Sequence, residues 1–527
     1  MLQIMKNESR VVKKHLGEIN TLADLVDITA RVYGNELHAI WQKSAKHDFK
    51  KSFMELWNDV VVNANYLMEA GYSGQRIGIF GKLNYKWMLK FLAVVCSGNI
   101  AVPLDKKDNV LEEKLGQAKL AGIYGSETVS EKYDLKLFQV KYSGNSKELL
   151  KLDSQIMPDD DAVIIFTSGT TGKSKGVILS HKNIVSNTKC GCFFLGKDFG
   201  EGDTSMPVLP PTHMLVITVG ILTCMLYGGT LCFGRGNKYI IKDFAVFKPR
   251  VLVLVPMIVE NIYDKIYIKA KNQIGEEKLK KAINLSNSLR KIKIDVRRKA
   301  FSEIHKSLGG NLETIICGGA KLDPKAAKGM TDFGINVCEG YGITECSPVI
   351  SCNRLKSNVF GSVGVKGPDE FCQIKVIDNE LCVKGDIVFK GYFENEKAYK
   401  EVVKDGWFHT GDLCEIKNGR IYIVGRKKNL IILSDGNNVS PEEIENYFKG
   451  FEYLKSFFVK EHNNKIIAMV YPNMDLDEDL DYMKEAIRTK IKEVNLELPA
   501  YKRISDVIFA EKDYEKTALG KIKRFKY

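Results

Sequence analysis

Residues 163–181 read VIIFTSGTTGKSKGVILSH, and this stretch decides the fold. Two apolar runs, at 163–166 and 177–179, enclose a loop that contains three glycines, five hydroxyl residues and two lysines. Glycine lets backbone N–H groups approach an anion closely, hydroxyls donate further hydrogen bonds, and lysines supply positive charge. The pattern therefore predicts a strand, a loop that holds a polyphosphate, and a second strand.

The loop differs from the Walker A phosphate loop. A Walker A loop has a glycine five residues before its Gly-Lys-Ser and leads from a strand into a helix. This chain has Thr167 at that position, and an extended apolar run follows the loop. An ordinary flexible surface turn is the alternative, which the concentration of anion donors disfavours.

Length and composition bound the class of protein. The chain has 527 residues, enough for about three lobes, with 44% hydrophobic and 27% charged residues. Its N-terminus lacks the apolar core of a secretory signal, and no apolar stretch reaches the ~18 residues of a membrane-spanning helix. The twelve cysteines show no ligand spacing, so we expect reduced core thiols and no structural metal site. These features predict a cytoplasmic protein.

Strand-like apolar runs alternate with helical periodicity before residue 350. The predicted strands are 76–80, 101–104, 163–166, 229–233, 251–255 and 314–317. Such alternation predicts an α/β fold whose sheets are largely parallel.

The pattern changes towards the C-terminus. Between 360 and 424, short alternating strands such as 371–377 and 381–384 indicate a small barrel or sheet lobe. A last unit begins after Gly425. Its first helix is predicted to start with Ser440 as N-cap, Pro441 as the first helical residue and Glu443 completing a capping box.

The net charge of +13 is concentrated in one segment. Residues 261–310 hold thirteen Lys and Arg residues against five Asp and Glu residues, a net charge of +8. A solvated helical face is one interpretation. The other is peripheral contact with an anionic membrane, where each nearby basic residue adds ~1 kcal/mol. Nucleic acid is disfavoured as a partner, because no aromatic residues are interleaved at readout spacing.

In its order TSGTTGKSKG, the loop resembles the phosphate loop of adenylate-forming enzymes, which include acyl-CoA synthetases, aryl-CoA ligases, adenylation domains and firefly-type luciferases. Further stretches resemble this family's motifs in the expected order: TIICGGA at 314–320, CEGYGITECSP at 338–348, WFHTGDL at 407–413, GRKK at 425–428 and KTALGKIKR at 516–524. The residues before 163 match the family only in their general alternation of strands and helices, without a matching motif. The chain looks most like a long-chain fatty acyl-CoA synthetase.

The resemblance implies an architecture. Residues 1–425 would form a large N-terminal domain of two doubly wound α/β subdomains plus a small β-barrel lobe. Residues 426–527 would form a small, mobile α+β domain, hinged at Lys428, that rotates between two half-reactions as lids do.

The resemblance also implies a nucleotide site. Its phosphate-loop members would be Thr167, Ser168, Gly169, Thr170, Thr171, Gly172 and Lys175. Near the adenine it places Gly318, Gly319, Ala320 and Tyr341, and Gly342 is a further member of the nucleotide site. Thr344 would contact the α-phosphate, Glu345 would help to hold Mg²⁺, Asp412 would accept hydrogen bonds from the ribose, and Arg426 would contact ribose or phosphate. Taken alone, the Gly-Gly and Gly-Asp turns are structurally ordinary.

The last motif contains the lysine that the family uses for adenylation. Lys521 follows a glycine in a Thr-x-x-Gly-Lys context, and by the resemblance it stabilises charge on the carboxylate and the α-phosphate. It lies 353 residues beyond Ser168, so it reaches the phosphates only if the small domain folds over the large one. A solvated, lysine-rich tail is the alternative.

The implied reaction has two steps. A carboxylate attacks the α-phosphate of ATP, which gives acyl-AMP and pyrophosphate, and a thiol then attacks the anhydride and releases AMP. ATP, Mg²⁺ and CoA are the predicted cofactor and co-substrates. The phosphopantetheine of an acyl carrier protein is the alternative acceptor.

A fatty acid is the predicted substrate. Residues 209–220 contain no acid that could pair with the ammonium of an amino acid, and a buried unpaired ammonium is costly. His213 and Thr218 in this segment are predicted to line the acyl pocket, with a structural role for His213 as the alternative. The 62 residues between Pro256 and Gly318 form a long basic helical insert, which resembles long-chain more than short-chain or aryl ligases.

A hypothesis from another class is a non-catalytic protein that binds or takes up fatty acids. The intact phosphate loop, Glu345 and Lys521 argue against it. Luciferase-type oxygenation has no positive sign in the sequence.

Overall fold

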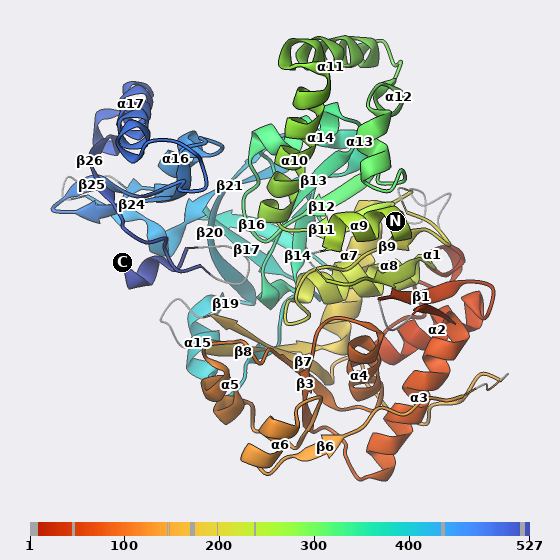
Figure 1. Cartoon of the computed structure of the whole chain (residues 1–527). Helices are drawn as coiled ribbons and strands as arrows, with labels where there is room; N and C mark the ends of the chain where they lie inside the picture. The colour runs from red at the N-terminus through yellow and green to blue at the C-terminus, as the bar shows by residue number, and fades with distance from the viewer. Residues whose placement is uncertain are drawn as a thin grey trace.

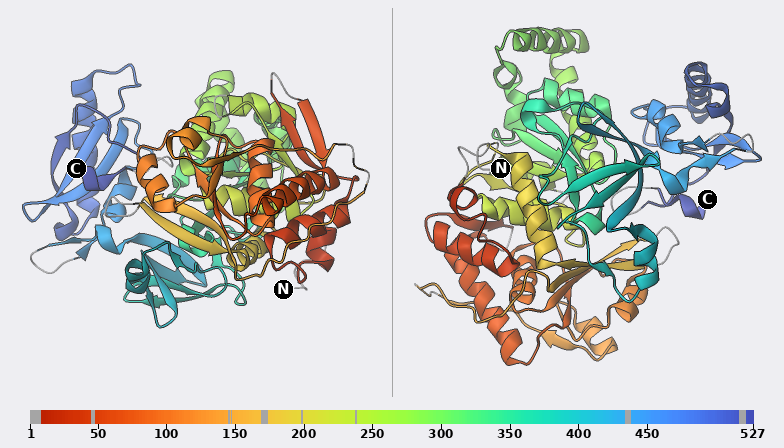
Figure 2. Two further views of the ribbon diagram at one scale, coloured as in Figure 1. Left: turned by 90° about the horizontal axis from the view of Figure 1, so that it is seen from below. Right: turned by 180° about the vertical axis from the view of Figure 1, so that it is seen from behind.

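The computed structural model describes residues 9–44, 48–144, 146, 148–168, 174–197, 199–236, 239–433, 438–516 and 522–527. Figure 1 shows two units in which helices cover sheets, an antiparallel sheet beside them, and a small C-terminal unit at one side. The two further views in Figure 2 show the same C-terminal unit projecting from the body, far from the N-terminal helices.

One sheet carries the predicted phosphate loop. In the described part of the chain its strand order is β18 (Gly391–Tyr392), β8 (Ser174–Ser180), β7 (Asp161–Ser168), β4 (Ile100–Leu104), β3 (Arg76–Phe80), β5 (Gly122–Tyr124), β6 (Lys136–Phe138). The strands from β7 to β6 are parallel, and β8 is antiparallel to β7. The connecting helices are α4 (Tyr85–Cys96), α5 (Leu111–Ala118) and α6 (Glu127–Lys132). The predicted strand–loop–strand arrangement is confirmed.

The second sheet is also largely parallel. Its order among the described residues is β15 (Val365–Lys366), β14 (Val349–Cys352), β13 (Asn336–Gly342), β12 (Thr314–Cys317), β11 (Val251–Leu254), β9 (Thr204–Ser205), β10 (Thr230–Phe233), β1 (His38–Lys43), β2 (Asp48–Ser52). The strands from β13 to β1 are parallel, and both edges are antiparallel. The predicted apolar runs all form strands of these two sheets, so the α/β assignment is confirmed.

Helices between the two sheets contribute to one large hydrophobic core. They are α1 (Arg10–Lys14), α2 (Leu22–Tyr33), α3 (Phe53–Glu69), α7 (His181–Leu195), the π-helical turn η1 (Val216–Leu222) and α8 (Thr223–Leu226). Capping boxes start α2 and α3, where the side chains of Thr21 and Ser52 accept the N–H groups of Asp24 and Glu55. All twelve cysteines lie in described segments and are buried free thiols, as predicted.

The basic insert is helical, as predicted. It contains α10 (Pro256–Ile274), α11 (Glu276–Lys291), α12 (Arg297–Ala300) and α13 (Ser302–Ser307), and α9 (Ile240–Phe247) and α14 (Pro324–Asp332) pack nearby. Figure 1 shows α11 standing away from the body of the molecule. Within the described segments, no helix combines the length and apolarity needed to cross a bilayer.

The predicted lobe of short strands is an antiparallel sheet. It contains β16 (Gln373–Ile377), β17 (Glu380–Lys384), β20 (Trp407–Lys417), β19 (Val403–Lys404) and β21 (Arg420–Arg426), and α15 (Glu396–Val402) precedes β19. The β16–β17 turn uses Asp378 and Asn379, both with positive φ (49° and 62°), as a two-residue hairpin requires.

The C-terminal unit has a hydrophobic core of its own. Its elements are β22 (Ile431–Ile432), β23 (Asn438–Val439), α16 (Pro441–Glu445), β24 (Leu454–His462), β25 (Lys465–Pro472), α17 (Leu480–Glu497) and β26 (Ile504–Phe509). This matches the expected α+β unit, whereas the boundary at residue 425 and its mobility stay predictions.

The predicted capping box of α16 is wrong in part. Ser440 is the N-cap and Pro441 the first helical residue, as expected, but the Ser440 side chain makes no capping hydrogen bond. Its hydroxyl donates instead to the carbonyl of Val424 at 3.0 Å. The Glu443 carboxylate binds the Lys502 ammonium at 2.7 Å. Contacts to other segments therefore replace the local box.

A lysine from the C-terminal unit reaches the large domain. Lys449 follows the short 3₁₀ turn η6 (Asn446–Phe448), and its ammonium donates to the carbonyl of Lys321 at 2.9 Å. Burial and the Lys321 charge lower the pKa of Lys449 to about 8, against the opposing effect of Glu260 and Glu339. This contact anchors the C-terminal unit beside the residues that follow β12.

Candidate active site

The phosphate-loop hairpin is anchored on both arms. Thr167 pairs with Lys175 and Ser168 with Ser174 across β7 and β8, and the Thr167 hydroxyl lies 3.5 Å from the Lys175 carbonyl. The N–H of Ser174 donates to the carboxylate of Glu113 at 2.9 Å. Gly169, Thr170, Thr171 and Gly172, predicted to bind phosphates, lie outside the described residues. The hairpin arms thus place the two ends of the predicted phosphate loop, and phosphate binding by the loop stays a prediction.

Glu345 is a buried carboxylate near this hairpin. It lies in the 3₁₀ turn η3 (Thr344–Cys346), and its Oε1 accepts a hydrogen bond from the Tyr392 hydroxyl at 2.8 Å. Burial raises the pKa of Glu345, while the Tyr392 hydrogen bond, Arg426 and Lys175 oppose the shift. The Lys175 ammonium lies 4.8 Å from the centre of the Tyr392 ring. The structure therefore brings the predicted residues Thr344, Glu345 and Lys175 together.

Asp412 lies between two predicted site residues. Its Oδ2 accepts the Tyr341 hydroxyl at 2.5 Å, and its Oδ1 accepts Arg426 Nε at 2.7 Å. Asp412 and Arg426 are also direct partners across β20 and β21. Burial and then the Asp412 charge raise the pKa of Tyr341, so the phenol stays protonated and donates. The trio forms a polar cluster that can accept ribose hydroxyls and still contact phosphate.

A turn before Asp412 sets its position. Gly411 has a φ of 73°, which favours glycine, and its N–H donates to Glu380 Oε1 at 2.9 Å. The Asp412 N–H donates to the Thr410 hydroxyl at 3.1 Å. Lys427 Nζ in turn binds Glu380 Oε2 at 3.0 Å. Hydrogen bonds from the backbone N–H groups of Gly411 and Asp412 therefore fix the position of the Asp412 carboxylate.

The expected adenine-binding segments end neighbouring strands. β12 and β13 are parallel, so Gly318, Gly319 and Ala320 lie beside the end of the strand that contains Tyr341. A Cβ at Gly342 would fall 2.1 Å from the Pro348 carbonyl oxygen, which explains glycine there. The juxtaposition agrees with a shared adenine site, which stays a prediction.

The other predicted residues are not part of these clusters. The Thr218 hydroxyl is fully buried in η1 and donates to the Ser347 carbonyl at 2.9 Å. His213 is half-buried in the turn before η1. Lys428 lies in the 3₁₀ turn η5 (Lys427–Asn429), and Lys521 lies outside the described residues. Acyl-pocket, hinge and adenylation roles for these four residues therefore stay predictions.

Sequence reasoning missed three supporting residues. Tyr392 binds Glu345, Glu380 fixes the Gly411 turn, and Glu113 binds the β8 arm. A buried carboxylate such as Glu345 needs a donor, but the sequence does not show which of the tyrosines supplies it. For Glu380 the sequence offered only its position directly before the predicted strand 381–384, which the structure pairs with the Trp407–Leu413 motif.

The donor set at Glu345 fits magnesium. Mg²⁺ is commonly held by one or two carboxylates together with substrate phosphates, so a single buried carboxylate near a phosphate loop suffices. Among the described residues, no group of three or more His, Cys, Asp or Glu side chains is arranged to hold a metal. The site fits an ion that arrives with a phosphate ligand.

Comparison with known proteins agrees with this arrangement. A sequence model of the family described as AMP-binding enzyme matches residues 26–393. This chain belongs to that family. The match contains the hairpin, Tyr341 and Glu345, and it ends before Asp412, Arg426 and Lys521.

Two relatives of this chain come from a plant and an animal. It is 32% identical over 351 residues to "Long chain acyl-CoA synthetase 7, peroxisomal" of Arabidopsis thaliana, covering 61% of this chain and 49% of that protein. It is 30% identical over 475 residues to "Long-chain-fatty-acid--CoA ligase 5" of Mus musculus, covering 78% and 69%. The chain thus spans about half the length of the Arabidopsis relative.

The fold of this chain recurs in solved structures. O-succinylbenzoate coenzyme A synthetase of Bacillus subtilis, in complex with ATP and magnesium ion, superposes with a TM-score of 0.74 at 19% identity, covering 95% of this chain and 98% of that one. The similarity confirms the predicted fold class, whereas the division of the chain at residue 425 stays a prediction.

Proposed function

We propose that this chain couples ATP to a carboxylic acid, forming acyl-AMP and pyrophosphate, and then transfers the acyl group to the thiol of CoA. The observation that carries the proposal is the proximity of two clusters: Asp412 with Tyr341 and Arg426, and Glu345 with Tyr392 and Lys175. The charge of Arg426 acts on Glu345 and opposes its raised pKa, which links the two clusters. The first cluster can hold a nucleoside, and the second lies beside the hairpin that would hold its phosphates.

Each group has a role in this proposal. Asp412 accepts ribose hydroxyls, Arg426 and Lys175 face negative oxygens, and Thr344 donates to the α-phosphate. Magnesium, held by Glu345 and the phosphates, supplies charge neutralisation during displacement. Lys521 stabilises the charge that develops when the carboxylate attacks.

The position of the C-terminal tail supports the role of Lys521. The pKa of Asp108 is lowered. Burial alone would raise this pKa, but the ammonium of Lys114, the Val110 N–H and the charge of Lys523 together lower it. Asp108 lies just before α5, the helix whose Glu113 binds the β8 arm of the loop. Lys523 is thus within electrostatic range of Asp108, although its ammonium binds Glu515.

A fatty acid is the proposed substrate and CoA the proposed acceptor. Relatives named long-chain acyl-CoA synthetases and ligases support both, and the buried apolar residues of η1 suit a hydrocarbon chain. An acyl carrier protein is the alternative acceptor.

Pyrophosphate exchange with a panel of acids tests the substrate. Transfer of each buried methylene contributes ~0.8 kcal/mol, so kcat/KM is expected to rise about fourfold per CH₂ until the pocket is full. The thioester product is then measured with CoA and with carrier protein in parallel. Exchange driven by amino acids but not by C8–C18 acids would contradict the substrate, and fatty-acid binding without AMP release would favour a non-catalytic protein.

Peripheral membrane contact is proposed for the basic insert. In the second half of α11 and just after its end, Leu285, Ile292 and Ile294 are 64%, 65% and 49% exposed, within the segment of net charge +8. Exposed apolar residues among lysines fit an anionic lipid surface.

Vesicle sedimentation tests this contact. Replacing Leu285, Ile292 and Ile294 together by serine is expected to weaken binding to vesicles of anionic phospholipid at least tenfold, because each side chain loses apolar burial in lipid. The matched control is Leu496→Ser, which removes a more exposed leucine elsewhere. Raising the salt concentration is expected to weaken the wild-type binding. Equal binding by the triple variant would contradict the proposal.

A further inference from the structure

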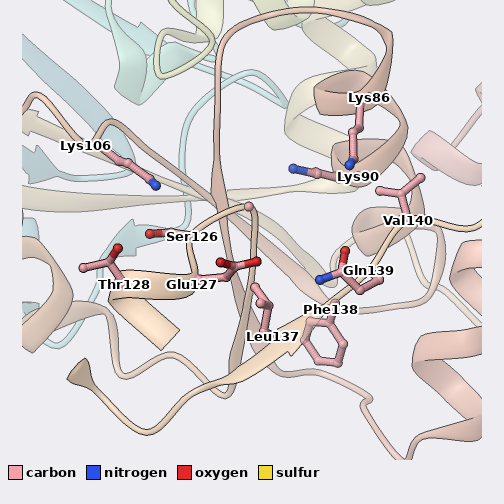
Figure 3. A pocket seen from close by; sticks show the side chains of 11 residues that line it. Lys86, Lys90, Lys106, Ser126, Glu127, Thr128, Leu137, Phe138, Gln139 and Val140 are labelled. Atoms are coloured by element: carbon pink, nitrogen blue, oxygen red, sulfur yellow. The ribbon is translucent and has the colours of Figure 1, made fainter. Parts of the chain in front are cut away.

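A cavity of about 320 Å³ lies at the carboxyl ends of parallel strands in the N-terminal sheet. Its walls come from α4, the segment after β4, the turn between β5 and α6, and the end of β6 (Figure 3). The chain forms β4 on one side of β3 and then crosses to form β5 on the other. Ligands of open α/β sheets bind where the strand order reverses in this way. The volume is at the lower end of the range for ligand pockets, which suits a small ligand.

Three lysines dominate the charge of this cavity. Figure 3 shows Lys86, Lys90 and Lys106 around the same hollow, with Glu127 as the one acidic lining residue. The lining side chains therefore carry a net charge of +2. Within the described part of the chain, none of the three lysines has a carboxylate at ion-pair distance. The protein compensates this positive charge only in part, through Glu127 in the lining and through the Tyr124 ring, whose centre lies 5.9 Å from Lys90 Nζ.

Lys90 is the least expected of these residues. It is only 7% exposed, and its ammonium has a single long hydrogen bond, 3.5 Å to the carbonyl of Phe80. Gly125, with a φ of 84°, makes room for it, because a Cβ there would fall 2.7 Å from Lys90 Nζ. Burial, followed by the charges of Lys86 and Lys106, lowers the pKa of Lys90 to about 8. A buried ammonium with so few partners is costly unless something else binds it.

The position of Lys86 and Lys90 on α4 makes their positive charges less favourable still. Lys86 and Lys90 are four residues apart on α4, so their like charges repel each other. Lys86 also lies in the first turn of α4, where the helix dipole disfavours a cation. An anion in the cavity would relieve burial, repulsion and dipole together. Several unfavourable interactions that a single ligand would remove indicate a binding site.

We infer that this cavity binds a phosphate-bearing anion through Lys86, Lys90 and Lys106, at a site separate from the phosphate-loop hairpin. The hairpin extends from β7, on the far side of β4 from β3 and β5. Lysine ammonium groups are compact donors that suit phosphate oxygens approached from several directions. The anion is either free phosphate or pyrophosphate, or the phosphate group of a nucleotide.

Amine labelling tests the site on the full-length chain. Brief acetylation is followed by mass spectrometry, with and without orthophosphate, pyrophosphate or adenosine 3′,5′-bisphosphate. We expect at least one probe to slow the labelling of Lys86, Lys90 and Lys106 fivefold or more, while the exposed lysines Lys136 and Lys151 react unchanged. The most potent probe identifies free phosphate or nucleotide as the source. Unchanged rates at the three cavity lysines with every probe, or equal slowing at the control lysines, overturn the inference.

A variant pair then tests the ligands. Lys86 and Lys106 are exposed, so K86Q/K106Q is expected to fold, and its thermal unfolding checks this. The concentration of probe that half-protects Lys90 is expected to rise at least tenfold in K86Q/K106Q. It is expected to stay within twofold in K136Q/K151Q, which changes net charge equally. Equal shifts in both variants would mean a nonspecific charge effect and would overturn the site. Because labelling does not depend on ligase activity, a failure here is distinct from a failure of the proposed function.

Discussion

Replacing Lys521 by alanine is expected to lower ATP–pyrophosphate exchange by about 10²–10³-fold, because the loss of one preorganised donor at a developing charge costs this much. Thioester formation from acyl-AMP supplied directly is expected to change little, because in acyl-AMP the carboxylate has already been converted into the anhydride. Both half-reactions are measured on the same preparation.

Two controls separate this role from the charge of the tail. Lys512→Ala removes an exposed lysine from the same segment and is expected to leave both half-reactions unchanged. Lys521→Arg retains the charge with a different shape and is expected to recover part of the exchange. If Lys521→Ala reduced both half-reactions equally, the proposed role in adenylation alone would be wrong.

Replacing Asp412 by alanine is expected to raise the KM for ATP by about 10²-fold, since hydrogen bonds to a charged group contribute ~1.5–3 kcal/mol each. The same change removes the acceptor for Tyr341 and the ion-pair partner of Arg426, so the ribose side of the site loses its order. Steady-state kinetics with varied ATP at saturating acid measures the effect.

Tyr341→Phe is the informative comparison for Asp412. It keeps the ring that is expected to flank the adenine and deletes one hydrogen bond to Asp412. A rise in the KM for ATP of tenfold or less is expected. Thermal unfolding of both variants shows whether the cluster also stabilises the fold. An unchanged KM in Asp412→Ala would remove Asp412 from the nucleotide site.

The strands could be predicted because they are local features of the sequence. The run at 163–166 is apolar without interruption and ends in a glycine-rich segment, and β3 and β12 have the predicted bounds. Parallel strands buried on both faces produce such runs. The Asp378-Asn379 turn is equally local, because both residues tolerate positive φ.

The contacts that complete the site could not be predicted in this way. Tyr392 binds Glu345 across 47 residues, and Ser440 donates to Val424 instead of closing its own helix. Such partners depend on how separate segments pack, and no periodicity records them. Asp412 itself was identified through family resemblance, since a Gly-Asp turn is ordinary by itself.

The anchor of the C-terminal unit has a thermodynamic consequence. Lys449 donates to the carbonyl of Lys321, the residue directly after the Gly318–Ala320 segment that is expected to contact adenine. Any shift of that segment when nucleotide binds also moves the oxygen that Lys449 holds. By linkage, the orientation of the C-terminal unit must then alter nucleotide affinity by the same factor with which nucleotide alters that orientation.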